Sequence, residues 1–434
     1  MNITILSIGS RGDIQPYVAL GRGLQATGHR VCVATHACWE GFTREHGLDF
    51  RPVAGDPRAM VEGEAGQKWL ATDRNPVTFM RRMMDAGLPM FWQMADDYWA
   101  ACQDADLILY PILAALPAAA IAEKLRVPAY PAYLQHVHST GAYPSGMLPA
   151  LPRLGAPYHR LTYVLSGELF WQAMRPIMSA WRQERLGLPA LPRRNVFPAW
   201  ERARTPCFYG FSPAVLPRAP EWGEHIHITG YWFLNSWTDP EVPVHTRPEQ
   251  ERLADFLASG PPPVFVGFGS MTERDPAQAA ELVVRALAIS RQRGVLLTGW
   301  GGLQPDNLPD EVVAIDSALF EWLFPQMAAV VHHGGAGTTA AGLAAGRPTV
   351  VVPFFADQHF WGWRVAALGA GPQPIRHRQL SAERLAAAIT EAVTNRTIQA
   401  RAEALGERIR AEDGVGTFVT LFQDAVSHTK EVMS

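Results

Sequence analysis

The chain has 434 residues, of which 48% are apolar and 18% charged, and its formal charge at pH 7 is −3. With about 150 residues as a typical domain size, this length predicts two or three domains that each bury a core, and it excludes disordered and disulfide-scaffold proteins. The 38 basic and 41 acidic residues form no basic stripe, which argues against a nucleic-acid partner.

Four cysteines are scattered along the sequence without a C-x-x-C pair or a metal-finger spacing. This usage is typical of reduced, buried thiols in a cytosolic protein. The first apolar run is too short for a signal peptide, and no run approaches the ~18 apolar residues of a membrane span. We therefore expect a cytoplasmic protein, with peripheral contact at a membrane left open.

Short apolar runs alternate with helical stretches along the first half of the chain. Residues 2–8 predict a strand, a glycine turn follows, and Pro16 is expected to begin the first helix. Further strands are predicted at 31–34, 107–110 and 127–130. Runs of this kind are typical of parallel strands that are buried on both faces of a doubly wound sheet.

Residues 76–99 depart from this pattern, because methionines and aromatic residues recur there at helical spacing. One interpretation is an amphipathic helix that faces the core. The other is the apolar wall of a ligand pocket, for which flexible methionine side chains are suited. The second interpretation makes Met83 and Met94 candidates for contact with a lipophilic ligand.

The second half repeats the alternation of strands and helices. Its strands are predicted at 264–268, 295–297, 312–315, 329–331 and 349–352. Several prolines at 213–248 indicate a linker between the halves. We expect two Rossmann-like α/β lobes that face each other across a cleft. The expected boundaries are an N-terminal lobe at 1–217, a linker at 218–248, a C-terminal lobe at 249–415 and a helix at 416–434 that returns to the first lobe.

A glycine-rich segment, His332–Thr339, follows a predicted strand and precedes a helix. Glycines let the backbone approach a ligand, and a helix N-terminus presents unpaired N–H groups to an anion. His333 and Thr338 add side-chain donors, so the segment predicts a phosphate site. The alternative is a plain glycine turn with core histidines. It is not a Walker loop, because it lacks the lysine.

Two further segments have side chains suited to the rest of a nucleotide sugar. Asp357 and Gln358 follow a predicted strand and offer donors and acceptors to adjacent sugar hydroxyls, although an aspartate at this position is also a common helix cap. Trp322 lies in the segment 321–326 and either stacks on a planar base or is buried in a turn.

These three segments, in this order, resemble the donor-binding signature of family 1 glycosyltransferases, which have the two-lobed GT-B fold. The resemblance is strongest to sterol glucosyltransferases and glycopeptide-antibiotic glycosyltransferases. Further support comes from Gly9–Pro16, Thr229–Leu234 and Gly267–Met271.

The resemblance also assigns roles to individual residues. It implies that Trp322 and Gln326 lie at the nucleobase, and that Asp357 and Gln358 hold the sugar. Plant members carry a Glu where this chain has Ala341, which leaves ribose recognition and the choice between uridine and thymidine open. The residues implied to hold the diphosphate are Ser270, His333, Gly335, Gly337 and Thr338.

The general base is expected in the first glycine turn. Many relatives have a histidine there, whereas this chain has Asp13, and in the glycopeptide enzymes an aspartate in this motif is implicated as the base. A carboxylate beside an acceptor hydroxyl can take its proton. If Pro16 is the first helical residue, capping does not explain Asp13, although a structural role such as a pair with Arg11 stays open. His136 and His138 are the alternative bases, and His136 is also a candidate for acceptor contact.

The resemblance implies an inverting glycosyltransferase that works without a metal and without a cofactor other than its nucleotide-sugar substrate. The expected donor is UDP-glucose and the expected acceptor is the hydroxyl of a lipophilic alcohol, such as a sterol or a polycyclic natural product. The sequence contains no D-x-D triplet. A sugar-nucleotide epimerase and a non-catalytic sugar-nucleotide binder are the alternatives.

Overall fold

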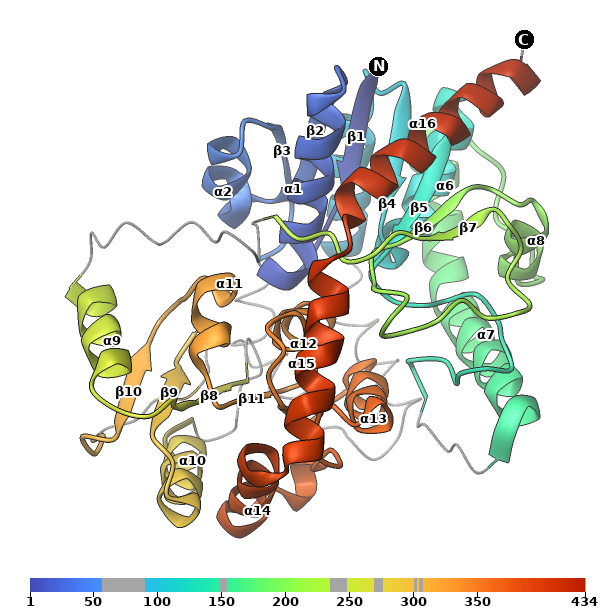
Figure 1. Ribbon diagram of the computed structural model, residues 1–434. Helices are drawn as coiled ribbons and strands as arrows, with labels where there is room; N and C mark the ends of the chain where they lie inside the picture. Colours follow the sequence, from blue (N-terminus) through green and yellow to red (C-terminus); the bar gives the residue numbers. More distant parts are fainter. Residues whose placement is uncertain are drawn as a thin grey trace. The chain divides into compact units, whose positions relative to one another are not determined.

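The computed structural model divides the chain into two compact units (Figure 1). The expected α/β class with two parallel sheets is confirmed. Unit 1 consists of Met1–Ser145, Leu151–Leu234 and Asp413–Ser434, and unit 2 of Gly146–Ala150 and Asn235–Glu412. The residues that the structure describes are 1–56, 90–148, 154–234, 248–268, 276–299, 303 and 307–433.

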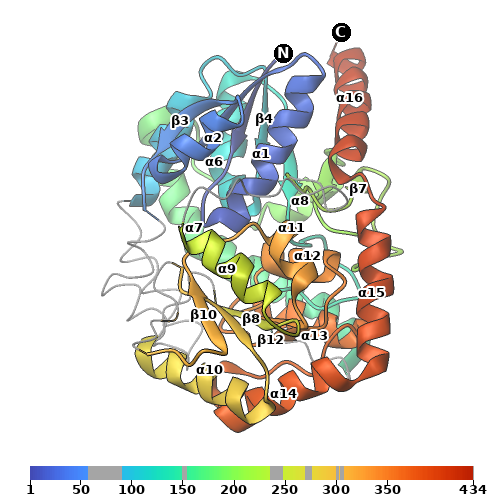
Figure 2. The same ribbon diagram turned by 60° about the vertical axis from the view of Figure 1, so that its left-hand side comes forward.

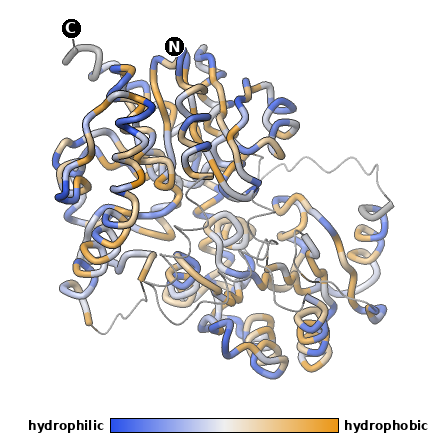
Figure 3. Tube along the Cα trace, turned by 180° about the vertical axis from the view of Figure 1, so that it is seen from behind, coloured by the Kyte–Doolittle hydropathy of each residue, from blue (hydrophilic) through white to orange (hydrophobic). Residues whose placement is uncertain are grey.

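Among the described residues, unit 1 is built on a seven-stranded parallel sheet in the order β3-β2-β1-β4-β5-β6-β7. Ile3, Ile5 and Leu6 in its first strand are at most 1% exposed, as expected for a strand covered on both faces. Hydrophobic residues run along the strands in Figure 3. The strands are β1 (Asn2–Leu6), β2 (Arg30–His36), β3 (Asp49–Val53), β4 (Leu107–Tyr110), β5 (Ala129–Tyr133), β6 (Cys207–Tyr209) and β7 (Ile226–Ile228).

The first helix of unit 1 begins at Arg11, so the prediction that it begins at Pro16 is wrong. Ser10 lies at its N-cap and starts the helix earlier in the glycine turn. Residues 90–101 are also helical. The other elements are α1 (Arg11–Ala26), η1 (Ala37–Trp39), α2 (Glu40–Glu45), η2 (Ile112–Ala114), α6 (Ala115–Leu125), α7 (Gly155–Trp181), η4 (Arg182–Leu186), α8 (Phe197–Arg202) and α16 (Gly414–Met433).

Strand β7 lies inside the segment 218–248, which the sequence predicts as a linker. Its residues pair in parallel with β6, and the guanidinium of Arg218 donates to the backbone oxygens of Ile226 and Trp222. Pro220 lies in a turn before this short edge strand, so proline content alone places the start of the linker too early. Unit 1 continues to Leu234.

Unit 2 has, within its described residues, a five-stranded parallel sheet in the order β10-β9-β8-β11-β12. Val264, Val331 and Val350 lie in one buried cluster with side chains of α10 and α14. Figure 2 shows these two helices together below the sheet. The strands are β8 (Val264–Gly267), β9 (Gly294–Leu297), β10 (Val312–Ile315), β11 (Ala329–His332) and β12 (Thr349–Val351). The helical elements are α9 (Pro248–Ala258), α10 (Pro276–Ser290), α11 (Phe320–Leu323), η5 (Phe324–Gln326), α12 (Ala336–Ala344), α13 (Gln358–Leu368), η6 (His377–Gln379), α14 (Ala382–Thr394) and α15 (Arg396–Arg410).

Helix α16 packs within unit 1, far in sequence from its neighbours. The rings of Phe418 and Phe208 have centroids 4.9 Å apart, and those of Phe422 and Tyr130 are 6.2 Å apart. A Cβ atom on Gly23 of α1 would lie 2.5 Å from Val415, which shows how closely the two helices approach. The last helix is therefore part of the core of unit 1.

No helix in the described part of the chain has both the length and the apolar character that crossing a membrane requires.

Candidate active site

In each sheet the strand order reverses at one place, and loops at the carboxyl ends of the strands beside such a reversal form the usual ligand site of doubly wound folds. In unit 2 this place lies between β8 and β11. The segment after β11 starts there, and the segment after β12 starts on the next strand of the sheet. These are the segments in which the sequence predicts phosphate and sugar contacts. Residues 269–275 after β8, which include Ser270, lie outside the described residues.

Helix α12 begins directly after β11, and no side chain caps its N-terminus. Its first intrahelical hydrogen bond runs from Thr339 N to Gly335 O (2.9 Å), so the N–H groups before Thr339 have no partner within the helix. Gly337 and Thr338 belong to this first turn and are half-buried. The positive end of the helix dipole and these N–H groups together favour an anion.

Glycine is required at two positions before this helix. Gly334 has φ +91°, and a Cβ atom there would lie 2.7 Å from Val351 Cγ1 and 3.0 Å from Gln358 O. A Cβ atom on Gly335 would lie 2.5 Å from His333 Nε2. The glycine turn after β11 therefore packs directly against the segment after β12, and the structure brings these two predicted segments together.

Both histidines of the motif are neutral at pH 7. Gly334 N donates to His332 Nδ1 (2.9 Å), so His332 carries its proton on Nε2, and burial lowers its pKa well below the usual value. Burial lowers the pKa of His333 to about 4. His333 Nδ1 is buried, and no described residue hydrogen-bonds to it. His333 thus has a ring nitrogen whose partner would have to be a ligand or water.

Asp357 and Gln358 are both held in place by hydrogen bonds near the start of α13. Gln358 Oε1 accepts from the N–H groups of Phe354 (2.9 Å) and Phe355 (3.2 Å). Asp357 is the N-cap residue but makes no capping bond, and its Oδ2 instead accepts from Trp361 Nε1 (3.0 Å). The carboxylate is therefore oriented by a neighbouring side chain rather than used as a cap.

The segment around Trp322 is fixed to the same part of unit 2. Gln326 Nε2 donates to Trp322 O (2.9 Å) across one turn. The half-buried Trp322 packs against the cluster that contains Leu323 and, from α12, Ala341. Trp322 and the glycine turn after β11 are thus linked through α12.

In unit 1 the strand order reverses between β1 and β4, and Asp13 follows β1 there. Its Oδ2 accepts from Ser10 N (2.9 Å) and Ser10 Oγ (3.0 Å), which is a capping box at the start of α1. The interpretation that capping does not explain Asp13 is therefore wrong. The missed signal is the Ser-x-x-Asp spacing, which a search for capping boxes finds.

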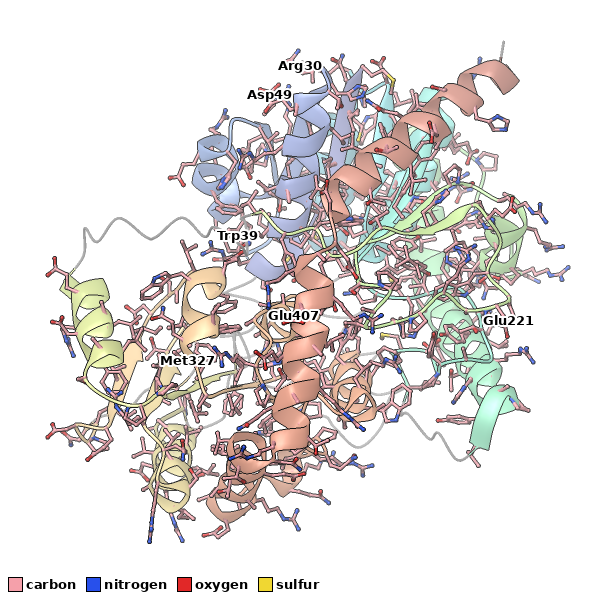
Figure 4. All side chains as sticks on the ribbon, viewed as in Figure 1. Arg30, Trp39, Asp49, Glu221, Met327 and Glu407 are labelled. Atoms are coloured by element: carbon pink, nitrogen blue, oxygen red, sulfur yellow. The ribbon has the colours of Figure 1, made fainter. Side chains whose placement is uncertain are left out.

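The capping box occupies only one of the two carboxylate oxygens of Asp13. No described residue donates a hydrogen bond to Oδ1, and the side chain is half-buried. Desolvation by burial raises the pKa of Asp13, and the two bonds from Ser10 offset part of that rise. Trp39, labelled in Figure 4, donates from Nε1 to Gly9 O (3.1 Å) and steadies the turn.

Each of the alternative bases, His136 and His138, uses one ring nitrogen in a hydrogen bond. The Tyr209 hydroxyl accepts from Val137 N (2.9 Å) and His138 N (3.1 Å), so its own proton goes to His138 Nδ1 (2.6 Å). His136 Nε2 donates to Pro144 O (2.9 Å) and the side chain is 3% exposed. Burial lowers the pKa of each histidine to about 4.

Of the two methionines proposed from the sequence to contact a lipophilic ligand, the structure describes only one. Met94 is buried on the helical residues 90–101, in agreement with a helix that faces the core. Met83 lies outside the described residues. The described residues contain no group of three or more histidine, cysteine or acidic side chains placed to hold a metal ion.

Two family models match the chain. Residues 3–130 match the N-terminal domain of glycosyltransferase family 28, and residues 301–415 match the C-terminal domain of proteins like erythromycin biosynthesis protein CIII.

Curated relatives include two fungal proteins named sterol 3-beta-glucosyltransferase. The one from Aspergillus fumigatus is 36% identical over 447 residues, covering 99% of this chain and 30% of its own length. The one from Cryptococcus neoformans is 36% identical over 455 residues, covering 100% of this chain and 28% of its own length. The chain therefore spans less than a third of these relatives.

Solved structures with the same fold include natural-product glycosyltransferases. The glycosyltransferase of kitacinnamycin has a TM-score of 0.67 at 21% identity, and the calicheamicin glycosyltransferase has 0.71 at 16%, each covering 98% of both chains. A further glycosyltransferase, solved in complex with dTDP, has 0.64 at 18% and covers 99% of this chain and all of that one. The GT-B fold and the resemblance to sterol and natural-product glycosyltransferases are confirmed.

Proposed function

Because this chain has the GT-B fold and its residues 3–130 match a glycosyltransferase family 28 domain model, we propose that it is an inverting glycosyltransferase. The proposed donor is a nucleotide sugar, with UDP-glucose preferred, and the proposed acceptor is the hydroxyl of a lipophilic alcohol such as a sterol. The 36% identity to sterol 3-beta-glucosyltransferases supports the choice of glucose and sterol.

The observation that carries this proposal is the uncapped N-terminus of α12 beside the oriented Asp357. The N–H groups of Gly335–Thr338 and His333 are proposed to hold the diphosphate, and Asp357 and Gln358 the sugar. Trp322 and Gln326 are proposed to contact the nucleobase. Ser270, outside the described residues, keeps the diphosphate role that the family resemblance implies.

In the proposed reaction the acceptor oxygen attacks the anomeric carbon as the bond to the diphosphate breaks. Asp13 Oδ1 takes the proton from that hydroxyl, because an alcohol is a poor nucleophile at neutral pH. The positive end of α12 stabilises the negative charge that develops on the leaving diphosphate. This single displacement converts an α-linked donor into a β-glycoside and needs no resident metal.

The deciding experiment is a product screen by mass spectrometry. UDP-glucose and dTDP-glucose are each incubated with a sterol, a polycyclic natural product or free glucose, with and without EDTA. We expect a glucosylated sterol that forms equally well in EDTA and has the β configuration by NMR. Conversion of the donor without any acceptor would indicate an epimerase, and donor binding without any product would indicate a binding protein.

A further inference from the structure

Arg347 lies just beyond the end of α12, opposite the glycine turn that precedes this helix. Gly346, with φ +69°, ends the helix, and Arg347 N donates to Gly342 O (3.3 Å) across that turn. The nine residues of α12 span about 13 Å. The uncapped N-terminus and Arg347 therefore lie at the two ends of one rigid element.

The guanidinium of Arg347 reaches the segment 321–326. Its Nη2 donates to Pro325 O, the carbonyl immediately before Gln326. Pro325 and Gln326 are half-buried, whereas Met327, which follows them and is labelled in Figure 4, is fully buried. Because Pro325 O and the N–H of Gln326 belong to one planar peptide, this bond orients the backbone that carries the Gln326 side chain.

Helix α15 fixes the end of α12 from which Arg347 extends. Arg410 Nη1 on α15 donates to Ala344 O (2.6 Å) at the last residue of α12. A Cβ atom on Gly406 of α15 would lie 2.5 Å from Gly346 Cα, so the two backbones are in direct contact. The backbone of Arg347 is thus held by helix packing, independently of what its side chain does.

A gain in stability does not explain the Arg347 side chain. Its Nε is buried, and no described residue hydrogen-bonds to it. Burial lowers the pKa of Arg347, and the nearby charge of Glu403 offsets only part of that effect. Such surroundings make a charged group costly, and an apolar side chain of similar size often serves stability as well. The contact of Nη2 with the segment 321–326 is therefore the better reason for an arginine at this position.

We propose that Arg347 is a positioning residue for nucleobase recognition, which acts through Pro325 O on Gln326 and Trp322. This role rests on the proposed function, in which Trp322 and Gln326 contact the nucleobase. The opposite end of α12 carries the proposed phosphate contacts, so Arg347 ties the base part of the donor site to the helix that holds the diphosphate. Removal of the guanidinium should loosen the base contacts and leave the diphosphate contacts in place.

The test is calorimetric titration of the full chain with UDP, ADP and inorganic pyrophosphate. The parent should bind UDP more tightly than either of the other two. Arg347→Met removes the donors from a side chain of similar length. It should weaken UDP about tenfold and pyrophosphate less than about twofold, and selectivity for UDP over ADP should fall. Arg347→Lys keeps the charge and a donor for Pro325 O, and it should recover part of the UDP affinity.

Two further variants separate positioning from a general loss of the site. Arg408→Met makes the same change in an exposed arginine on α15 and should bind all three ligands as the parent does. His333→Ala removes a proposed diphosphate contact and should weaken UDP and pyrophosphate by the same factor.

Equal loss of UDP and pyrophosphate in Arg347→Met, or unchanged UDP affinity, overturns the proposal for Arg347 while the donor site stands. A parent protein that binds pyrophosphate as tightly as UDP refutes instead the proposed nucleobase contacts of Trp322 and Gln326, and the role of Arg347 with them.

Discussion

The two carboxylate oxygens of Asp13 have different roles, one observed in the structure and one proposed. Oδ2 closes the capping box with Ser10, while Oδ1 receives no hydrogen bond from any described residue. A carboxylate that only caps a helix has no need of burial, whereas burial raises the pKa of this one and makes it a stronger base. The structural and catalytic interpretations of the residue are therefore compatible.

Asp13→Asn separates the capping role of this side chain from its proposed role as a base. The amide oxygen still accepts from Ser10, so the helix and the fold should persist, but the side chain can no longer take a proton. We expect kcat to fall on the order of 10²–10⁴-fold, with donor affinity unchanged because the proposed donor residues belong to unit 2. The measurement pairs steady-state kinetics with calorimetric titration of the nucleoside diphosphate.

Asp49→Asn is the matched control, because it makes the same change in a half-exposed carboxylate paired with Arg30 at 2.9 Å (Figure 4). It should leave kcat unchanged. Normal turnover in Asp13→Asn would remove Asp13 from the chemistry.

His333 predicts a pH dependence of stability. Burial lowers its pKa to about 4 from an ordinary 6.5, so the unfolded chain takes up a proton before the folded one does. The stability that comes from keeping this ring unprotonated in the folded chain is fully present above pH 6.5. It is lost as the pH falls toward 4. We expect His333→Asn to reduce the loss between pH 7 and 5 by on the order of 1 kcal/mol in urea titrations. An unchanged pH profile would contradict the burial of this ring.

At the scale of elements, the proposed donor site depends on the glycine turn before α12. Gly334→Ala places a Cβ atom against Val351 and Gln358 in a backbone region that L-residues avoid. We expect affinity for the nucleoside diphosphate to fall at least about tenfold, because the N–H groups of α12 depend on this turn.

Gly28→Ala controls for backbone strain in that experiment. Gly28 has a similar φ of +87°, but nothing lies within 4 Å of its added Cβ atom. It should lower the free energy of unfolding by about 1–2 kcal/mol without changing nucleotide affinity. Equal affinity in the two variants would show that the turn does not shape the site.

Most of the fold could be predicted from the sequence because its strands are short, apolar and bounded by glycine turns. Strands β4 and β10 have the bounds that the apolar runs predict. The three-residue β7 could not be found, since its pairing with β6 is long-range and prolines surround it. The glycine turn and Asp357 lie close together because both follow parallel strands of one sheet, which the sequence predicts. The hydrogen bond from Tyr209 to His138 depends on long-range packing that no local sequence pattern encodes.

At the scale of the whole molecule, α16 completes the core of unit 1. Phe418 is fully buried against Phe208 and Trp232. Phe418→Ala should lower the free energy of unfolding of unit 1 by about 3–5 kcal/mol. Thr420→Ala on the exposed side of the same helix should change it by less than about 0.5 kcal/mol.

The measurement is denaturant unfolding followed by tryptophan fluorescence, with nucleotide affinity as a check on unit 2. Unit 2 should retain its affinity in both variants. Equal stability of the two variants would mean that α16 is not needed by unit 1.

The division of unit 1 between the two ends of the chain has a consequence for biosynthesis. Strands β1–β7 leave the ribosome first, but α16 follows only after all of unit 2 has been translated. Until then the apolar side chains that receive Phe418 and Phe422 have no cover, so nascent unit 1 offers a binding surface to chaperones. The helices of unit 2 cover both faces of its own sheet. Unit 2 can therefore fold during translation, before α16 has been made and unit 1 is complete.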